Sequence, residues 1–213
     1  DDKFYKHIGI DLPGLFKAFL SEIGIGSPRG GSTITQQFVK NTFLSSERTY
    51  TRKLQEIVLS LSVELRFNKE EIMLMYLNAI PYGSNAYGIE LAAERYFEKE
   101  ASELTLSESA ILASIPKAPT RYSPYGNYRY TTLHFDLNEE TLGDRKITGE
   151  GDLEYEEWTR GLIGKEFTMP DGSTFYIKGR SELVLDRMEE LKLISSAQKE
   201  EAVSEVKEIA FTP

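Results

Sequence analysis

The chain has 213 residues, of which 40% are hydrophobic and 28% are charged. These fractions are close to those of globular proteins and exclude wholesale disorder, a collagen-like repeat and a coiled coil, so we expect one domain, or one domain with an insertion. The 25 Lys and Arg residues against 34 Asp and Glu give a formal charge of −9. Because such a body repels a polyphosphate backbone, we expect no nucleic acid partner.

Cysteine is absent, which excludes a disulfide framework and thiolate metal sites. The two histidines, His7 and His134, lie in no recognisable zinc or nucleophile motif. No apolar run approaches the roughly 18 residues that indicate a membrane-spanning helix. The chain begins without Met or a leader-like segment, and we interpret it as a piece of a longer protein whose membrane anchor lies upstream.

Helical periodicity dominates the first half of the chain. Apolar residues recur at helical spacing in segments that we predict as helices, over about 11–23, 32–41, 47–67, 69–80, 89–97 and 107–115. Pro13 falls in the first turn of the first segment, where its missing N–H costs little. Ser32 and Thr33 are suited to cap the second segment, and the Gly/Pro-rich stretch 25–31 before them is predicted as a mobile loop.

The composition changes after residue 119. From about 130 to 178 the sequence is acidic and has little helical periodicity, and helical pattern resumes at about 181 and again from 195. The turn signal Pro170–Ser173 lies between the β-prone runs 165–169 and 174–177 and predicts a β-hairpin. We therefore expect a mainly α fold in which residues 1–129 and 179–213 form the main domain. Residues 130–178 form an insertion, which we interpret as a surface element without activity.

The most informative segment for chemistry is residues 48–56, at the start of the long helix predicted over 47–67. Arg48, Arg52 and Glu56 lie four residues apart with Lys53 adjacent, so three cations and a carboxylate share one wall of the helix, which we expect to be exposed. An apolar stripe lies opposite, made of Leu54, Ile57, Val58, Leu61 and Leu65. Spacing alone leaves two interpretations open, a solvated face held by weak ion pairs and a clamp for phosphate or pyrophosphate.

A second polar cluster precedes this wall. Residues 30–37 read Gly-Gly-Ser-Thr-Ile-Thr-Gln-Gln, so a flexible glycine pair leads into a hydroxyl-rich helix start with free N–H donors. The segment lacks the Lys-Ser/Thr of a P-loop. Its interpretations are an ordinary N-cap after a loop, or a site for an anion or sugar hydroxyls. Gln37, Lys40 and Asn41 extend one polar face along the same helix.

The order of these motifs along the chain is similar to that of a known protein family. The matching segments are residues 30–37 with Lys40-Asn41, then Arg52-Lys53-x-x-Glu56, then Ile72 to Tyr76-Leu77-Asn78, and finally Arg180-x-x-x-Val184-Leu185. The opening Asp1-x-x-Phe4-x-x-His7-x-Gly9 fits as well. Over about residues 1–125 and 180–210 the chain resembles the peptidoglycan glycosyltransferase family. This is the transglycosylase domain of class A penicillin-binding proteins and of monofunctional transglycosylases.

The resemblance implies a lysozyme-like helical domain with a small membrane-facing jaw. It implies polymerisation of lipid II into glycan strands, with inversion at the anomeric carbon and release of undecaprenyl pyrophosphate. The implied partners are lipid II, the growing glycan strand and the membrane surface, at the extracytoplasmic face of the bacterial cell membrane, with a transpeptidase domain further along the parent chain. No cofactor is required, although a divalent cation such as Mg²⁺ or Mn²⁺ could accompany the pyrophosphate.

The resemblance also implies site residues. Those expected to bind substrate or pyrophosphate are Lys40, Arg48, Arg52, Lys53, Ser32, Thr33, Gln36, Gln37, Asn41, Asp1 and Arg180. Glu56 is the catalytic carboxylate within the chain, expected to orient the basic residues or to help hold a divalent cation. Those expected to contact the membrane are Leu15, Phe16, Phe19 and Leu20. The alternative for these four residues is packing in the core.

Two departures from the family pattern affect the expectation. The general-base Glu of the family is expected immediately before Asp1, outside this sequence, so the fragment by itself is expected to be inactive. Leu74 stands where members usually carry a Glu. Two other functions remain open, a non-catalytic module that binds lipid II or peptidoglycan, and a lysozyme-like glycan hydrolase.

Overall fold

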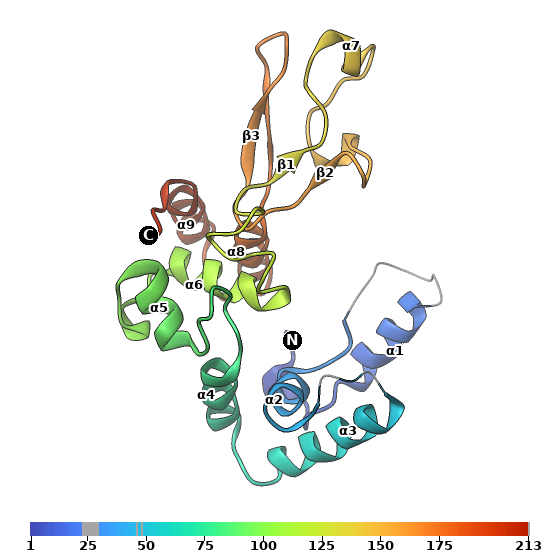
Figure 1. The fold of residues 1–213 in the computed structure, drawn as a ribbon, viewed down its shortest axis with the longest axis vertical. Helices are drawn as coiled ribbons and strands as arrows, with labels where there is room; N and C mark the ends of the chain where they lie inside the picture. The colour runs from blue at the N-terminus through green and yellow to red at the C-terminus, as the bar shows by residue number, and fades with distance from the viewer. Residues whose placement is uncertain (23–29, 46, 48, 213) are drawn as a thin grey trace. The chain divides into compact units, whose positions relative to one another are not determined.

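The structure of the chain is a computed structural model that describes residues 1–22, 30–45, 47 and 49–212, without the side chains of residues 17–19, 21 and 22. The chain divides into two compact units, Asp1–Ile80 and Pro81–Pro213. In the first unit (Figure 1) the described elements are η1 (Phe4–Lys6), α1 (Leu12–Glu22), α2 (Ile34–Phe43), α3 (Tyr50–Glu64) and α4 (Lys69–Ala79).

The helices begin where polar side chains satisfy the free N–H groups of a first turn. The Thr33 hydroxyl accepts from the Gln36 N–H at 3.1 Å, and the Gln36 side chain accepts from the Thr33 N–H at 2.9 Å, which confirms the predicted cap of α2. The Thr49 hydroxyl caps α3 by accepting from the main-chain N–H of Arg52 at 3.1 Å. Because this cap fixes its start, α3 is shorter than the predicted 47–67 helix.

The first unit has a small apolar core. Helix α2 packs against both α3 and α4, and the buried apolar side chains are Phe4, Phe38, Val39, Ile72 and Ile80. The ammonium group of Lys69 lies 4.5 Å from the centre of the Phe4 ring, which closes the core beside η1. The site residues described below therefore stand on helices that share one core.

Helix α3 is turned the opposite way from the prediction. Leu54 is 65% exposed and Leu65 is 87% exposed, whereas Glu56 is 2% exposed and Ser60 is fully buried. The expectation of an exposed polar wall is therefore wrong, since Glu56 of the polar wall is buried, whereas Leu54, Val58 and Leu65 of the apolar stripe are exposed. The inward face is tolerated because its charges pair with one another, which offsets much of the cost of removing them from water.

The second unit combines helices with short strands (Figure 1). Its described elements are α5 (Ile89–Phe97), η2 (Ala101–Glu103), α6 (Leu106–Ser114), η3 (Ile115–Lys117), β1 (Thr132–Leu133), α7 (Glu139–Leu142), η4 (Glu150–Asp152), β2 (Trp158–Thr159), β3 (Lys165–Thr168), β4 (Thr174–Ile177), α8 (Arg180–Glu190) and α9 (Ser196–Glu208). Helix α6 packs against α8 and α9 over fully buried side chains such as Ile111 and Leu185. The mainly helical fold is thus confirmed.

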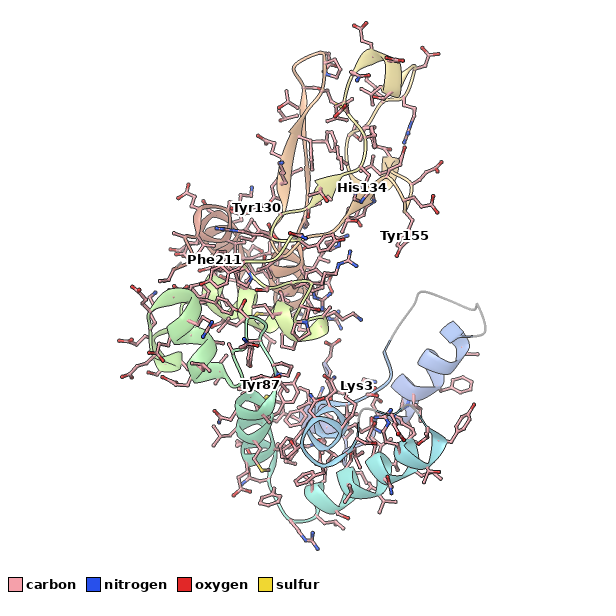
Figure 2. All side chains as sticks on the ribbon, in the orientation of Figure 1. Lys3, Tyr87, Tyr130, His134, Tyr155 and Phe211 are labelled. Carbon is pink, nitrogen blue, oxygen red and sulfur yellow. The ribbon has the colours of Figure 1, made fainter. Side chains whose placement is uncertain are left out.

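Residues 130–178 contain the strands. Strands β3 and β4 pair antiparallel, which confirms the predicted hairpin, and β1 pairs antiparallel with β2. The β1–β2 pair was not predicted, because strands of two residues are too short to show an alternating pattern. These strands and α7 enclose a core of their own, made of Leu142, Ile147, Phe175 and Ile177. The hairpin projects from the start of α8, and the side chain of Tyr155 stands out into solvent (Figure 2).

None of the helices formed by the described residues is both long and apolar enough to cross a bilayer. An aromatic grouping lies at the end of the described chain, where the Arg129 guanidinium is 4.6 Å from the centre of the Phe211 ring and 5.2 Å from the centre of the Tyr130 ring (Figure 2). This grouping anchors the last residues onto the second unit.

Candidate active site

One turn of α3 gathers two cations around a buried carboxylate. The Lys53 ammonium and the Arg52 guanidinium both contact Glu56, the latter at 3.7 Å between Nη1 and Oε2. Lys53 also donates to the Ser32 hydroxyl at 3.0 Å. The exposed fractions of the side chains are 2% for Glu56 and 35% for Lys53, so the carboxylate is enclosed while the ammonium reaches solvent. The two polar clusters found in the sequence thus meet at Ser32.

Two buried donors of the first unit have no acceptor in the part of the chain that the structure describes. They are Nε of Arg52 and Nε2 of Gln36. A buried polar group without a partner costs roughly 1–3 kcal/mol. A ligand oxygen that reaches either donor would remove that cost, so both donors favour an oxygen-rich ligand.

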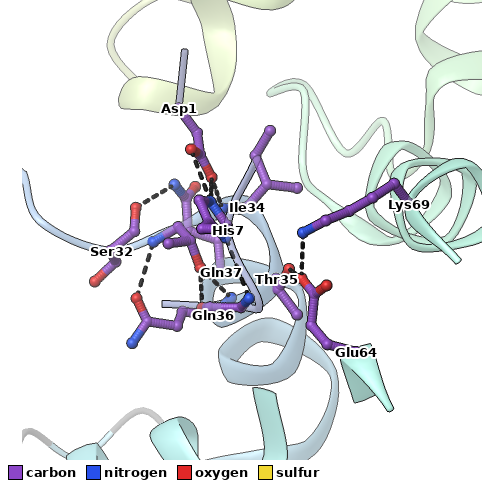
Figure 3. Close-up of polar contacts among 11 residues, drawn as sticks. Asp1, His7, Ser32, Ile34, Thr35, Gln36, Gln37, Glu64 and Lys69 are labelled. Atoms are coloured by element: carbon purple, nitrogen blue, oxygen red, sulfur yellow. Dashed lines mark hydrogen bonds and ion pairs between the residues drawn. The ribbon is translucent and has the colours of Figure 1, made fainter. Parts of the chain in front are cut away.

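Asp1 is held at the N-terminus of α2 (Figure 3). Its Oδ2 accepts from the Ile34 N–H at 2.8 Å, and its Oδ1 lies 3.0 Å from Nε2 of His7. A carboxylate is favoured there by the positive end of the helix dipole. Nδ1 of His7 accepts from the Gly9 N–H at 3.1 Å, so the ring proton lies on Nε2 and is donated to Asp1.

The charge state of His7 follows from its surroundings. Burial, and then the nearby Lys69 ammonium, lower the pKa of His7, while Glu64 and Asp11 act more weakly in the opposite direction. A neutral ring is also what the Gly9 N–H requires, because only an unprotonated Nδ1 accepts its hydrogen bond. His7 therefore serves as a neutral donor that orients Asp1.

A carboxylate that the sequence analysis missed joins three helices. Oε1 of Glu64, at the end of α3, accepts from the Thr35 hydroxyl of α2 at 2.5 Å and from the Lys69 ammonium of α4 at 2.7 Å (Figure 3). The pair spans five residues across the turn between two helices, so helical periodicity does not reveal it. This contact fixes the start of α2 relative to the helix that carries Glu56.

The remaining predicted residues of α2 divide between the fold and the surface. The Thr33 hydroxyl donates to the Gly9 carbonyl at 2.7 Å and accepts the capping bond, so it serves the fold. Nε2 of Gln37 lies 3.5 Å from the Ser32 carbonyl oxygen. Lys40 and Asn41 are exposed. These last two side chains are therefore open to a ligand.

Two further predicted residues lie elsewhere. Arg48 is outside the described residues. Arg180 belongs to the second unit, at the start of α8, where its Nε donates to the Ser114 carbonyl at 3.0 Å. For a metal, the described residues offer no group of three His, Asp or Glu side chains. Glu56 is instead surrounded by cationic partners, which does not suit a cation held by protein side chains alone.

The predicted membrane residues lie on α1. Phe16 is 63% exposed, which argues against packing in the core. Leu15 and Leu20 are half-buried. The side chain of Phe19 is outside the described part of the chain. Phe16 thus supports an outward-facing surface on this helix.

Comparison with known proteins identifies the family of this chain. The family model described as Transglycosylase matches residues 1–139. The chain belongs to the transglycosylase family.

Its relatives are penicillin-binding proteins. Penicillin-binding protein 1F of Bacillus subtilis (strain 168) is 43% identical over 141 residues, which cover 66% of this chain and 19% of that protein. Penicillin-binding protein 1A of Neisseria gonorrhoeae is 45% identical over 171 residues, covering 76% of this chain and 21% of that protein. The chain thus spans about a fifth of the length of these relatives. A crystal structure of penicillin-binding protein 1A from Haemophilus influenzae aligns over 84% of this chain and 16% of that one, with a TM-score of 0.37 at 23% identity.

Proposed function

We propose that the chain is the part of a peptidoglycan glycosyltransferase that polymerises lipid II into glycan strands and releases undecaprenyl pyrophosphate. The observation that carries this proposal is the group of Lys53, Arg52 and Glu56 beside Ser32. It supplies clustered positive charge, with an orphaned guanidinium donor, next to a hydroxyl-rich helix start. A reaction that expels a pyrophosphate requires such a group.

The leaving group is the first chemical demand. The acceptor 4-hydroxyl oxygen attacks the anomeric carbon of the donor sugar, and the bond from that carbon to the pyrophosphate oxygen breaks with inversion. The pyrophosphate departs with the bonding electrons, and Lys53 and Arg52 offset its charge, together with Lys40 and Arg48. Glu56 acts as a positioning residue, because it holds both cations on one turn of α3. A divalent cation shared by Glu56 and the pyrophosphate belongs to the same proposal.

The proton of the acceptor hydroxyl is the second demand. By resemblance, its base is a Glu directly before Asp1. Asp1 is fixed to the first N–H groups of α2 by its bond to Ile34. A preceding residue has its Cα about 3.8 Å from that of Asp1. The base would therefore stand near the same helix start as Ser32.

The membrane is the third element of the proposal, because lipid II is lipid-borne. The outward stripe of α3 is apolar, and a groove of about 590 Å³ runs between it and the end of α2, lined by side chains that include Phe43, Leu44, Leu54 and Val58. We assign this face, together with Phe16 on α1, to contact with the membrane surface at the extracytoplasmic side. The polar face of α3 then points away from the lipid, towards the pyrophosphate that Lys53 and Arg52 would bind.

The polymerisation test uses a chain with one Glu added before Asp1. We expect this chain to convert labelled lipid II into glycan polymer, and the Lys53→Gln variant to lose at least about 100-fold of the rate. The matched control is Lys3→Gln, because Lys3 is an exposed lysine outside the site. Binding of lipid II without polymer would support the binding module instead, and release of muropeptides from sacculi would support the hydrolase.

The membrane assignment has a separate test. We expect Phe16→Ser and Leu54→Ser each to weaken binding to liposomes while leaving the midpoint of urea unfolding nearly unchanged, because both side chains are exposed. The control Leu193→Ser removes an equally exposed leucine of the second unit. A large loss of stability in the first two variants would show that these residues are core.

A further inference from the structure

Lys69 is a cation of the first unit that takes no part in the proposed reaction. It is the first residue of α4, and its side chain is 18% exposed. Its ammonium donates to the Glu64 carboxylate of α3 at 2.7 Å and lies 4.5 Å from the centre of the Phe4 ring of η1. The charge of Lys69 is therefore held where three elements of the first unit meet.

The Phe4 ring also contacts His7. The two rings meet edge to face, with 6.2 Å between their centres. The His7 side chain is 8% exposed and that of its partner Asp1 is 6% exposed, so little water screens the charges around them. Figure 3 shows these two side chains together with Lys69 and Glu64 around the start of α2.

The hydrogen bonds of His7 depend on its charge. Its Nδ1 accepts from the Gly9 N–H at 3.1 Å, and the Gly9 carbonyl accepts from the Thr33 hydroxyl at 2.7 Å. A proton on Nδ1 would set two donors against each other. Gly9 packs closely against α3, since a Cβ there would lie 3.0 Å from Cγ of Glu64. Protonation of His7 would therefore displace the turn after η1 and the segment that carries Asp1.

Four charged groups of the described chain act on the His7 ring. Asp1 contacts it, Asp11 precedes α1, Glu64 ends α3 and Lys69 begins α4. Burial, and then the Lys69 charge, lower the pKa of His7, whereas the carboxylates of α3 and of the residue before α1 act more weakly in the opposite direction. Without Lys69, the remaining three groups are all carboxylates, which favour a charged ring.

A purely structural role explains only part of this arrangement. The bond between Lys69 and Glu64 joins α4 to α3, and any donor at position 69 would serve that junction. The helix itself gives no reason for a cation, because the helix dipole disfavours positive charge at an N-terminus. The position of the ammonium over Phe4, whose ring meets His7, instead indicates an electrostatic role.

We propose that Lys69 is a positioning residue that keeps His7 uncharged at neutral pH and thereby holds the Asp1 carboxylate at the start of α2. A neutral ring keeps both of its bonds, the one from Gly9 and the one to Asp1. The proposed base directly precedes Asp1, so its position depends on the same contacts. This last step rests on the proposed function, whereas the effect of Lys69 on His7 does not.

The first test measures the charge of His7 by NMR titration of its ring in the whole 213-residue chain. His134→Gln removes the signal of the other histidine. In this background we expect Lys69→Met to move the titration midpoint of His7 to higher pH, because the cation is lost. Glu64→Gln should move it to lower pH, because a carboxylate is lost. A role confined to joining helices predicts no such opposite shifts.

The second test measures polymerisation in the chain with a Glu added before Asp1. We expect Lys69→Met to lower kcat about tenfold more at about pH 6 than at about pH 8, with KM nearly unchanged, because the base is misplaced only when His7 is charged. Lys69→Arg keeps the charge and should restore the profile. The matched control is Lys99→Met, which removes a 2.7 Å ion pair with Glu108 in the second unit and should change neither measurement.

The outcomes are distinct. An unchanged His7 midpoint in Lys69→Met overturns the proposal. If that variant does not fold, Glu64→Gln decides, since a lower midpoint supports the proposal and an unchanged one overturns it. Shifted midpoints with an unshifted pH profile of kcat overturn the positioning role. If the midpoints shift as expected but the parent with the added Glu makes no polymer, the proposed function fails and the effect of Lys69 on His7 stands.

Discussion

Removal of the Glu56 carboxylate tests whether α3 is organised around its buried charges. Breaking a buried ion pair costs about 3–5 kcal/mol, because the partners keep their charge without compensation. Here Lys53 is 35% exposed, and water screens its share of the interaction. We therefore expect Glu56→Ala to lower the free energy of unfolding by about 2 kcal/mol, and Glu56→Gln, which keeps the volume and one acceptor, by about 1 kcal/mol.

The assay is urea unfolding followed by circular dichroism, where a fall in the midpoint at constant slope measures the loss of stability. Glu94→Ala, an exposed glutamate on α5, is the control. In the chain with a Glu added before Asp1, both Glu56 variants should also lose about 100-fold of polymerisation, because the two cations are misplaced. If Glu56→Ala unfolds at the wild-type midpoint and polymerises normally, the reasoning from buried charge is refuted.

Three further predictions concern stability. A Cβ at Gly161 would lie 2.2 Å from a main-chain carbon, so Gly161→Ala should cost about 1–3 kcal/mol or more in urea unfolding, whereas Gly149→Ala, which faces open space, should cost little. The hydrogen bond from Arg145 lowers the pKa of Glu157 from 4.5 to about 2. The contribution of Glu157 to the free energy of unfolding is therefore complete above pH 4.5 and is lost as the pH falls towards 2. Over this pH range we expect the fluorescence of the single tryptophan to change, and Glu157→Gln to abolish the change. An unchanged titration in this variant would contradict the prediction. Because the pKa of His7 is lowered, the contribution of His7 to the free energy of unfolding is complete above pH 6.5 and is lost as the pH falls below that value. His7→Gln should therefore reduce the pH dependence of the urea unfolding midpoint between about pH 6.5 and 5.

Local structure was predictable because its causes lie close together in the sequence. The cap at Thr33 depends on Gln36, three residues away, and the β3–β4 hairpin depends on one turn signal. The same locality explains why the bounds of α5 agree with the prediction, Ile89–Phe97. The ordered motifs also identified the family, which the match over residues 1–139 confirms.

The tertiary structure decided which groups meet and which face of a helix is buried. Periodicity shows that α3 has a polar face and an apolar face, but it cannot show which of them the neighbouring helix covers. The inward position of Glu56 depends on Lys53 reaching Ser32, a contact across 21 residues of sequence. The junction at Glu64 likewise exists only when three helices assemble, because Thr35 and Lys69 come from different elements.

The amino-acid order by itself therefore determined most of the helices, the β3–β4 hairpin, the cap of α2 and the family, since each rests on short-range bonding or on a recognisable motif. Only the folded chain determined that α3 buries the Glu56 carboxylate and exposes Leu54 and Val58. It also determined that the Lys69 ammonium lies against Glu64 and the Phe4 ring. The physical reason is that the free energy of a buried charge depends on partners distant in sequence, and no local pattern records them.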